Sequence, residues 1–460
     1  MARPASAFLL LFAALLPASG CRREPVGSSP RPPDILFVLV DDLSTDIDLY
    51  GGGARTPALD RLAAQGRRFD HTYCQYPLCN PSRASIFSGW RPERTRVWGN
   101  LRDPAPWLRE AVLLQDHFAR NGYYTARVGK AYHSRFENEF HWSEVVETYG
   151  GPATGEEAVA VEWGAWSGDE SAMPDALGAR NALRILTAPR SQPVFLVFGL
   201  LKPHAPWVVP ERYLRLYPPQ ETNLPASATA VPPSIVRSAR RTPIPREQWP
   251  AALGAYRAAV TFADAQIGAV LEGLQRAGTL DRTVVVVTSD NGLHVADHGI
   301  FGKSTLLEPA LRVPLVIAAP GIARPGVPTA ALVELVDLYP TLVDLCGLPP
   351  VAGLDGVSLR RLLEDPQGSV KEAAFSMLKI GAARAGQAGR SVRDQRYRFT
   401  LWPDGSEELF DLLADPDELA NLASSPAEDR VRLALRRRLD TLPPVVAAQA
   451  EGALALPTHR

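Results

Sequence analysis

The chain has 460 residues, of which 49 are Lys or Arg, 50 are Asp or Glu and 46% are hydrophobic. This length allows one large hydrophobic core and a smaller subdomain, because single cores stop growing near ~250–300 residues. The balanced charge excludes a global field of the kind that draws proteins to nucleic acid or to anionic membranes. We therefore expect no nucleic-acid partner, and any anion must be recognised locally.

Residues 1–21, MARPASAFLLLFAALLPASGC, have the pattern of a secretory signal: a short basic end, an apolar stretch and small residues before Cys21. The apolar stretch is too short to span a bilayer comfortably. Small residues directly before a Cys resemble the bacterial lipoprotein cleavage box, which predicts a lipid anchor at Cys21; cleavage without lipidation is the alternative. Residues 22–33 are charged and rich in Pro and Ser, as in a tether. We expect an exported bacterial protein, periplasmic or anchored at the outer membrane.

Short apolar runs and helical patterns alternate along the next part of the chain. The runs lack strict alternation, which is typical of strands buried on both faces; they cover residues 34–42, 123–129, 193–200, 283–291 and 312–320. Helices are predicted over 56–66, with a Thr56 cap and a Gly66 stop, over 107–122 and over 251–278. Strands alternating with helices predict a mostly parallel sheet covered by helices on both faces.

The pattern changes near residue 370. Residues 390–403 and 406–422 are typical of antiparallel strands with a turn, and residues 427–440 of a helix. We therefore predict a catalytic domain over 34–370 and a small C-terminal α+β subdomain over 371–460. Two long Pro-rich or polar loops, 136–178 and 203–250, interrupt the core, and loops of this length are usually either functional or disordered.

The cysteines do not form a disulfide framework, although export would permit one. Cys346 is expected to be a small core residue near the end of a helix, and Cys74 is expected to be structural. Cys79 lies in a polar Asn-Pro-Ser-Arg turn with no evident partner. Its place in the chain needs another explanation.

Acidic pairs follow two of the predicted strands. Asp41-Asp42 end the first run and Asp290-Asn291 end the fourth. In an open α/β sheet, ligands bind beyond the carboxyl ends of the strands. Converging carboxylate and amide oxygens would suit Ca²⁺ or Mg²⁺ better than zinc. For either pair alone, capping of the next turn is the alternative.

Cationic side chains follow the other runs. Lys130 and His133 come after 123–129, Lys202 and His204 after 193–200, and Lys303 shortly after the second acidic pair. A lone Lys is usually solvated, and a lone His is usually packed. Together at one sheet edge, beside a divalent cation, they predict a strong site for a compact, highly charged anion.

The stretch CNPSRASIFSG, residues 79–89, resembles the sulfatase signature Cys-x-Pro-Ser-Arg, and GYYTARVGKAYH, residues 122–133, resembles the second signature of that family. The resemblance covers about residues 34–425 with the motifs in the family's order, and RPERTRVWGN, GKAYH and LKPHAPW are most similar to the iduronate-2-sulfatase branch. It implies the α/β/α sandwich of the alkaline phosphatase superfamily, with a large, mostly parallel mixed sheet and a small C-terminal antiparallel sheet. It also implies hydrolysis of a sulfate monoester on a sulfated saccharide.

For Cys79, the resemblance implies oxidation to formylglycine by a maturation enzyme that recognises Pro81 and Arg83. The aldehyde hydrates to a geminal diol. One hydroxyl of the diol attacks sulfur and expels the alcohol, and the other then ejects sulfate and regenerates the aldehyde. No water has to attack the covalent ester.

The resemblance also assigns roles by position. Ca²⁺, or Mg²⁺ in its place, would be held by an oxygen of modified residue 79 and by Asp41, Asp42, Asp290 and Asn291. Arg83 would hold the modified side chain. The sulfate oxygens would be neutralised by Lys130, Lys202 and Lys303. His204 would protonate the leaving alcohol, with Lys303 as the competing acid; His133 would assist sulfate release, and Asp290 would accept a proton from the diol.

Some features leave alternatives open. His294 and His298 have no secure role; we expect loop packing or a surface position for both, and a position facing the site is the alternative. Trp163, Trp166 and Trp207 either stack on sugar rings or pack within the protein. Two other functions fit less well: a phosphonate or phosphate-ester hydrolase on the same scaffold, and a surface lipoprotein that binds sulfated glycans without turnover and keeps Cys79 unmodified.

Overall fold

The computed structural model describes Met1 and residues 31–148, 162–232, 244–379 and 388–443. The described residues from Pro33 onward belong to one compact unit. The predicted signal, its Cys21 and most of the predicted tether lie outside the described residues. Among the helices of the described ranges, none is both long and apolar enough to cross a membrane.

A large mixed sheet forms the centre of this unit, with the strand order β11-β2-β12-β8-β1-β6-β3-β4 and β13 paired with β2. Four predicted strands are confirmed as β1 (Asp34–Val40), β3 (Tyr124–Gly129), β6 (Val194–Leu200) and β8 (Thr283–Ser289). β1 pairs in parallel with both β6 and β8, and β3 pairs in parallel with β6. The ends of β1 and β8 therefore lie side by side, as the predicted site requires.

The part of the sheet beyond β8 contains antiparallel strand pairs. The predicted run 312–320 divides at Pro314 into β11 (Arg312–Val313) and β12 (Leu315–Ala318), because a proline has no N–H for the ladder. β12 is antiparallel to β8 and to β2 (Arg67–Tyr73). The remaining strands are β4 (Glu144–Val146), parallel to β3, and β13 (Thr329–Glu334), parallel to β2.

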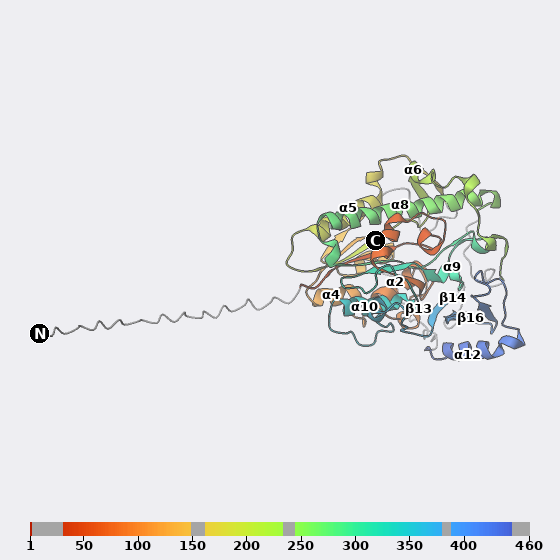
Figure 1. Cartoon of the computed structure of the whole chain (residues 1–460). Helices are drawn as coiled ribbons and strands as arrows, with labels where there is room; N and C mark the ends of the chain where they lie inside the picture. Colours follow the sequence, from red (N-terminus) through yellow and green to blue (C-terminus); the bar gives the residue numbers. More distant parts are fainter. Residues whose placement is uncertain (2–30, 149–161, 233–243, 380–387, 444–460) are drawn as a thin grey trace, which may run out of the picture. The chain divides into compact units, whose positions relative to one another are not determined.

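Helices cover both faces of the sheet (Figure 1). Ile35, Phe37 and Leu39 of β1 belong to one hydrophobic core, with α2 (Cys79–Ser88), α4 (Leu114–Arg120) and α10 (Leu338–Leu345). The alternate residues of β1 belong to a second core, with α1 (Pro57–Gln65), α5 (Pro174–Thr187) and α8 (Trp249–Arg276). Successive side chains of a strand point to opposite faces, so the sheet is filled on both sides. The predicted α/β/α sandwich is confirmed.

Two helix predictions need correction. The predicted helix over 107–122 is helical only in α4, because Leu113 has an extended backbone and residues 107–112 lie in turns. Thr56 does sit at the start of α1, but its side chain makes no capping hydrogen bond. The carboxylate of Asp264, on α8, accepts the backbone N–H groups of Ala58 and Leu59 instead, both at 2.9 Å.

The capping of α1 by Asp264 leads to a prediction about stability. Asp264→Ala leaves two helix N–H groups without their buried acceptor, so we expect the free energy of unfolding to fall by about 2 kcal/mol. Urea unfolding measures the change. Glu272→Ala is the control, because it removes the exposed Arg61–Glu272 pair between the same two helices and should cost less than about 1 kcal/mol. Equal losses in the two variants would contradict the capping role.

The C-terminal part contains the predicted antiparallel sheet, with strand order β14-β15-β16-β17. Its strands are β14 (Ala374–Lys379), β15 (Ala388–Arg393), β16 (Tyr397–Leu401) and β17 (Glu407–Asp411), and α12 (Asp429–Leu439) packs on them. β14 also donates a backbone hydrogen bond to Gln75, from Met377 N at 2.9 Å. The boundary between residues 370 and 371 stays a prediction.

Short elements complete the described chain. The helices are α3 (Pro92–Thr95), α6 (Glu211–Leu214), α9 (Glu308–Leu311) and α11 (Arg360–Glu364). β5 (Trp163–Trp166) pairs with β7 (Trp207–Pro210), and β9 (His294–Val295) pairs with β10 (Phe301–Gly302). The two long predicted loops therefore contain ordered elements of their own.

Candidate active site

The two acidic pairs meet where β1 and β8 end. Asn291 Nδ2 donates to Asp42 Oδ1 at 2.7 Å, and Asp42 N donates to Asp290 Oδ1 at 3.2 Å. One ligand atom from each of Asp41, Asp42, Cys79 and Asp290 lies within 4.8 Å of the others. All of these side chains are buried. The structure thus brings together the residues in which the sequence predicts a cation site.

Cys79 is the first residue of α2 and has no exposed surface. Its Sγ lies 3.3 Å from Asp41 Oδ1 and 2.8 Å from Lys303 Nζ. Burial, followed by the nearby Asp41 carboxylate, raises the pKa of the thiol well above its ordinary value despite Lys303. A thiol that stays protonated is a poor nucleophile. The position is central, but the unmodified side chain is badly suited to attack an ester.

Arg83 lies one helical turn after Cys79, on the same face of α2. Its Nε donates to Asp290 Oδ2 at 2.7 Å, and its Nη1 donates to the carbonyls of Lys130 and Ala131 at 2.6 and 3.0 Å. Its Nη2 lies 3.4 Å from Asp41 Oδ1. Arg83 therefore links the helix that begins at Cys79 to the ends of three sheet strands.

Lys130 and Lys303 reach the acidic residues directly. Lys130 Nζ donates to Asp41 Oδ2 at 2.6 Å, and Lys303 Nζ donates to Asp42 Oδ1 as well as to Cys79 Sγ. Burial opposes ionisation of Asp41, but Lys130, His204, Arg83 and Lys303 together hold the pKa of this carboxyl well below its ordinary value. Both lysines stay charged, because the carboxylates outweigh burial and raise the pKa of each.

Two glycines allow the backbone of Lys130 to pass close to the end of β6. Gly129 has φ of 70°, and a Cβ there would lie 2.2 Å from the carbonyl oxygen of Gly199. A Cβ at Gly199 would in turn lie 1.9 Å from the carbonyl oxygen of Lys130. Only glycine fits at both places, where the ends of β3 and β6 pass each other.

His204 lies at the partly open side of the cluster. Its Nε2 is 3.8 Å from Asp42 Oδ2, and its side chain is 30% exposed. Its Nδ1 lies 2.7 Å from the carbonyl oxygen of Ala205, which can only accept, so Nδ1 carries a hydrogen. This contact leaves Nε2 as the nitrogen that faces the site.

The contacts of Lys202 and His133 give less support to their predicted roles. The Lys202 amine donates to the Pro206 carbonyl of its own loop and contacts none of the acidic cluster by a hydrogen bond in the described residues. Burial lowers its pKa to about 8. Burial, followed by Lys130, lowers the pKa of His133 to about 3, so its imidazole is neutral at neutral pH. Of the predicted cations, Lys130 and Lys303 have the strongest geometric support.

The cluster fits a divalent cation. Asn291 Oδ1 is a buried acceptor that receives no hydrogen bond in the described structure, while the Nδ2 of the same amide donates to Asp42. Three buried carboxylates, of Asp41, Asp42 and Asp290, are matched by three cations, of Arg83, Lys130 and Lys303. A divalent ion would leave the site with a net positive charge. Such a site suits a monoanionic ester together with an ionising nucleophile.

These motifs belong to a known family. The family model described as sulfatase matches residues 33–348, which is more than half of the chain. The chain belongs to the sulfatase family. This sulfatase also matches, over residues 296–444, a model described as the C-terminal part of N-sulphoglucosamine sulphohydrolase. It is therefore a sulfuric ester hydrolase.

Similar curated proteins extend over most of the sulfatase. A sulfatase of Formosa agariphila is 29% identical, covering 91% of this chain and 88% of that protein. A choline-sulfatase of Rhizobium meliloti is 30% identical, covering 86% and 83%. The iduronate 2-sulfatase of Mus musculus is 28% identical, covering 69% of each chain.

Solved structures share the fold. BT4656 in complex with its substrate D-glucosamine-2-N,6-O-disulfate has a TM-score of 0.76 at 21% identity, covering 89% of this chain and 97% of that one. BT1596, described as a 2-O GAG sulfatase, has a TM-score of 0.74 at 24% identity, covering 89% and 91%. The phosphonate monoester hydrolase of Agrobacterium radiobacter has a TM-score of 0.77 at 22% identity, covering 88% and 94%.

Supporting residues of the sulfatase site were not singled out from the sequence. Tyr256, on α8, donates from its hydroxyl to the Asp42 carbonyl at 3.0 Å, and Ser289 Oγ donates to the Asn291 carbonyl at 2.7 Å. The carboxylate of Asp175, on α5, accepts the N–H groups of Leu201 and Lys202 at 2.8 and 2.9 Å. A Tyr, Ser or Asp in a helix or strand carries no local signal of such a contact, because the partner is distant in sequence.

The remaining sequence predictions have mixed outcomes. His294 and His298 are buried, so packing is confirmed and a surface position is wrong. Trp207 is buried against Tyr256 and Phe301, which excludes sugar stacking for this residue in the described structure. Trp163 and Trp166 are half-buried on β5. Cys74, Cys79 and Cys346 are free and buried, as expected for Cys74 and Cys346.

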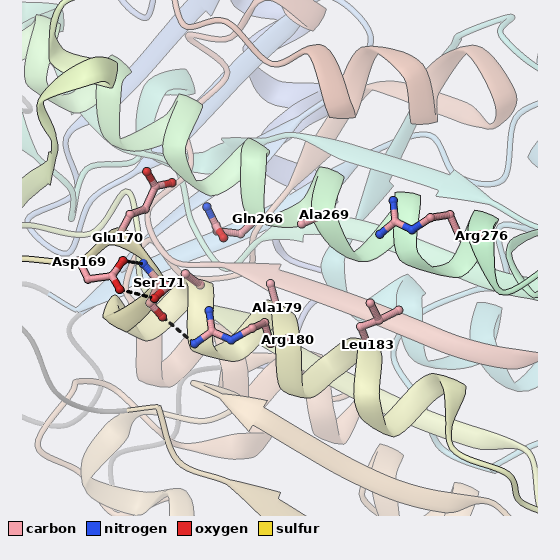
Figure 2. A pocket seen from close by; sticks show the side chains of 10 residues that line it. Asp169, Glu170, Ser171, Ala179, Arg180, Leu183, Gln266, Ala269 and Arg276 are labelled. Carbon is pink, nitrogen blue, oxygen red and sulfur yellow. Dashed lines mark hydrogen bonds between the residues drawn. The ribbon is translucent and has the colours of Figure 1, made fainter.

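A hollow of about 510 Å³ lies between α5 and α8, away from the predicted site residues (Figure 2). Its lining includes the small or apolar side chains of Ala179, Leu183 and Ala269 and the charged side chains of Arg180 and Arg276. Arg180 is held by the Ser171 carbonyl at 2.6 Å. None of the residues in which we predict the chemistry lines this hollow, so it does not belong to the sulfatase site.

Proposed function

We propose that this sulfatase removes sulfate from a sulfated saccharide, using formylglycine made from Cys79 and a bound Ca²⁺. The observation that carries the proposal is the position of Cys79, which is fully buried and in contact with Asp41 and Lys303. The raised pKa of its thiol keeps the unmodified side chain protonated. Modification would place an oxygen nucleophile where the thiol is unsuited to attack. The further proposal of export with a lipid on Cys21 rests on residues 1–21 alone.

Mass spectrometry of the tryptic peptide Phe69–Arg83 tests the modification directly. Protein made together with its maturation enzyme should carry an aldehyde or its hydrate at residue 79. An intact thiol at residue 79 in a fully active preparation would refute the proposal.

The cation would be held by oxygen atoms of Asp41, Asp42, Asp290 and Asn291 and of modified residue 79, a set of hard ligands that suits Ca²⁺ and also admits Mg²⁺. When bound, it would supply positive charge to the sulfate ester and to the ionising nucleophile. The chain's own contribution is to hold these oxygens in place. Arg83 fixes Asp290 and Asp41, and Tyr256 fixes the backbone of Asp42.

The remaining site residues act on the substrate. Lys130 and Lys303 would neutralise sulfate oxygens, since both amines are charged and lie against the acidic cluster. His204, with Nε2 toward the site, would protonate the leaving alcohol. His133 is neutral and would donate an N–H hydrogen bond to departing sulfate without transferring charge. Lys202 would contribute positive charge without a hydrogen bond to the acidic cluster, because its amine donates to the Pro206 carbonyl.

The acid role of His204 predicts a dependence on the leaving group. His204→Ala should lower kcat/KM about 100-fold for a sugar sulfate, whose alkoxide must be protonated as it departs. For 4-nitrophenyl sulfate, whose leaving group needs no proton, the loss should be below about threefold. Parallel steady-state kinetics measure both. Equal losses on both substrates would refute the acid role of His204.

The saccharide substrate is supported by the relatives. One similar protein is named iduronate 2-sulfatase, and two proteins of the same fold are described with D-glucosamine-2-N,6-O-disulfate as substrate and as a 2-O GAG sulfatase. A 2-O-sulfated uronate within an anionic polysaccharide is therefore our first candidate. A panel of defined sulfated oligosaccharides tests it. Desulfation of galactose or fucose sulfates alone would refute the uronate assignment.

A second activity has a specific observation in its favour. With a divalent ion bound, the charges of the cluster suit any monoanionic ester, and the phosphonate monoester hydrolase of Agrobacterium radiobacter shares the fold. Kinetics with matched aryl esters of sulfate, phenylphosphonate and a phosphodiester decide between the two. A higher kcat/KM for either phosphorus ester would overturn the preference for sulfate.

A further inference from the structure

The segment that presents Lys303 to the site has an unusual backbone. Between β9 and α9, the non-glycine residues Ala296, His298 and Ser304 have φ of 75°, 55° and 67°. Residues with a side chain adopt this left-handed conformation at a cost, so it persists only where surrounding contacts hold it. Lys303 directly precedes Ser304 and contacts both Cys79 and Asp42. The position of Lys303 therefore depends on the contacts that fix this segment.

A turn in the C-terminal part, residues 415–418, holds the segment on both sides of Lys303. We call this turn the clasp. His298 Nε2 lies 2.7 Å from the Asp417 carbonyl oxygen, which can only accept, so the imidazole donates. Glu308 N, just beyond Lys303, donates to Glu418 Oε2 at 2.6 Å. A small apolar cluster joins the same two parts of the chain, with Ile300 and Leu307 from the segment and Phe410 and Leu412 from β17 and its end.

Glu418 is the centre of the clasp. It is fully buried, has a left-handed φ of 51°, and accepts from Arg398 Nε at 2.8 Å in addition to Glu308 N. Arg398 also pairs with the Glu308 carboxylate. Burial, which outweighs the effect of Arg398, raises the pKa of Glu418 to about 8, so its carboxyl is largely neutral at neutral pH. The buried ion pair beside it, Arg398 with Glu308, contributes little net stability, so stability alone does not account for the arrangement.

We propose that Glu418 is a positioning residue for the sulfatase reaction: through Glu308 N and Arg398, it fixes the strained segment that holds Lys303 against residue 79 and Asp42. The inference rests on the proposed role of Lys303 at the sulfate. It assigns a positioning role to the turn that follows β17.

The test begins with Glu418→Ala in the full chain, made with the maturation enzyme. On an aryl sulfate, kcat should fall tenfold to hundredfold, because small displacements of a catalytic group have effects of this order. Glu418→Gln keeps an oxygen that can accept from Glu308 N, so it should recover at least half of that loss on a logarithmic scale.

A double-mutant cycle separates positioning from general damage. If Glu418 acts through Lys303, then Glu418→Ala should change kcat less than about twofold in a Lys303→Ala background. The same fold loss in both backgrounds would overturn the proposal. Should Glu418→Ala fail to fold, Glu418→Gln and Glu418→Asp are put through the same cycle.

The matched control is Glu407→Ala. Glu407 lies on β17 and pairs with Arg432, at 2.5 Å, and with Arg436 of α12, so its removal disturbs the same sheet without touching the clasp. It should lower the unfolding temperature and leave kcat unchanged. A kcat loss as large as that of Glu418→Ala would overturn the proposal.

Hydrogen exchange gives a readout that does not depend on turnover. Peptides covering residues 296–304 should exchange at least fivefold faster in Glu418→Ala than in the wild type, and no faster in Glu407→Ala. If the modified wild-type protein hydrolyses no aryl sulfate, the proposed function fails, while unchanged exchange in Glu418→Ala is what refutes the clasp.

Discussion

Cys79→Ala will abolish sulfatase turnover and leave the fold intact. We expect kcat on an aryl sulfate to fall by at least about 10⁴-fold, because the change removes the proposed nucleophile. The fold should survive, since Cys79 contributes one buried sulfur, whose contacts are Asp41 and Lys303 rather than the hydrophobic core of α2. Circular dichroism and thermal unfolding check the fold, and single-turnover kinetics check the loss.

Cys346→Ala is the matched control for this experiment. Cys346 is also free and buried, but it lies at the end of α10 and not in the acidic cluster. Its replacement should keep kcat within about twofold of the wild type. Substantial turnover by Cys79→Ala, above one tenth of the wild-type rate, would mean that the reaction does not pass through residue 79.

Asp42→Ala should release the cation and lower kcat about 1,000-fold, because the charge that stabilises the sulfate is then lost with the ligand. The change also leaves Asn291 Nδ2 and Lys303 Nζ without their shared acceptor. Metal analysis after dialysis should find about one equivalent of Ca²⁺ in the wild type and far less in the variant. After a chelator has removed the cation, added Ca²⁺ should restore activity to the wild type but not to the variant.

Asp46→Ala controls for loss of a carboxylate in the same stretch of chain. Asp46 pairs with Arg257, at 2.8 Å, and takes no part in the acidic cluster. This variant should keep its Ca²⁺ and most of its activity. A wild-type protein that keeps full activity with no divalent ion would refute the cation proposal.

Much of the site follows from the sequence because its residues come directly after buried strands. The parallel pairing of β1 with β8 and of β3 with β6 makes neighbouring strand ends meet, so Asp41, Asp290 and Lys130 converge without any knowledge of the loops. The motif around Cys79 adds a helix that begins at this edge. The roles of the Lys and His residues stay predictions, although the geometry fits best for Lys130, Lys303 and His204.

The rest depends on contacts that sequence periodicity does not carry. The start of α1 is capped by Asp264 from α8, and not by Thr56 next to it. The apolar spacing of 107–122 is compatible with a helix, but Leu113 is extended and only α4 forms. The Lys202 amine turns back to its own loop. Each of these outcomes is decided by a partner distant in the chain or by the local loop geometry.

If residue 79 is oxidised as we propose, the complete burial of Cys79 also sets an order of events during biosynthesis. A modifying enzyme must enclose the side chain it oxidises, and it cannot do so once α2 has docked against the ends of β1 and β8. Oxidation would therefore compete with folding. A chain that folded first would keep its thiol, so the active fraction of a preparation would report which of the two processes was faster.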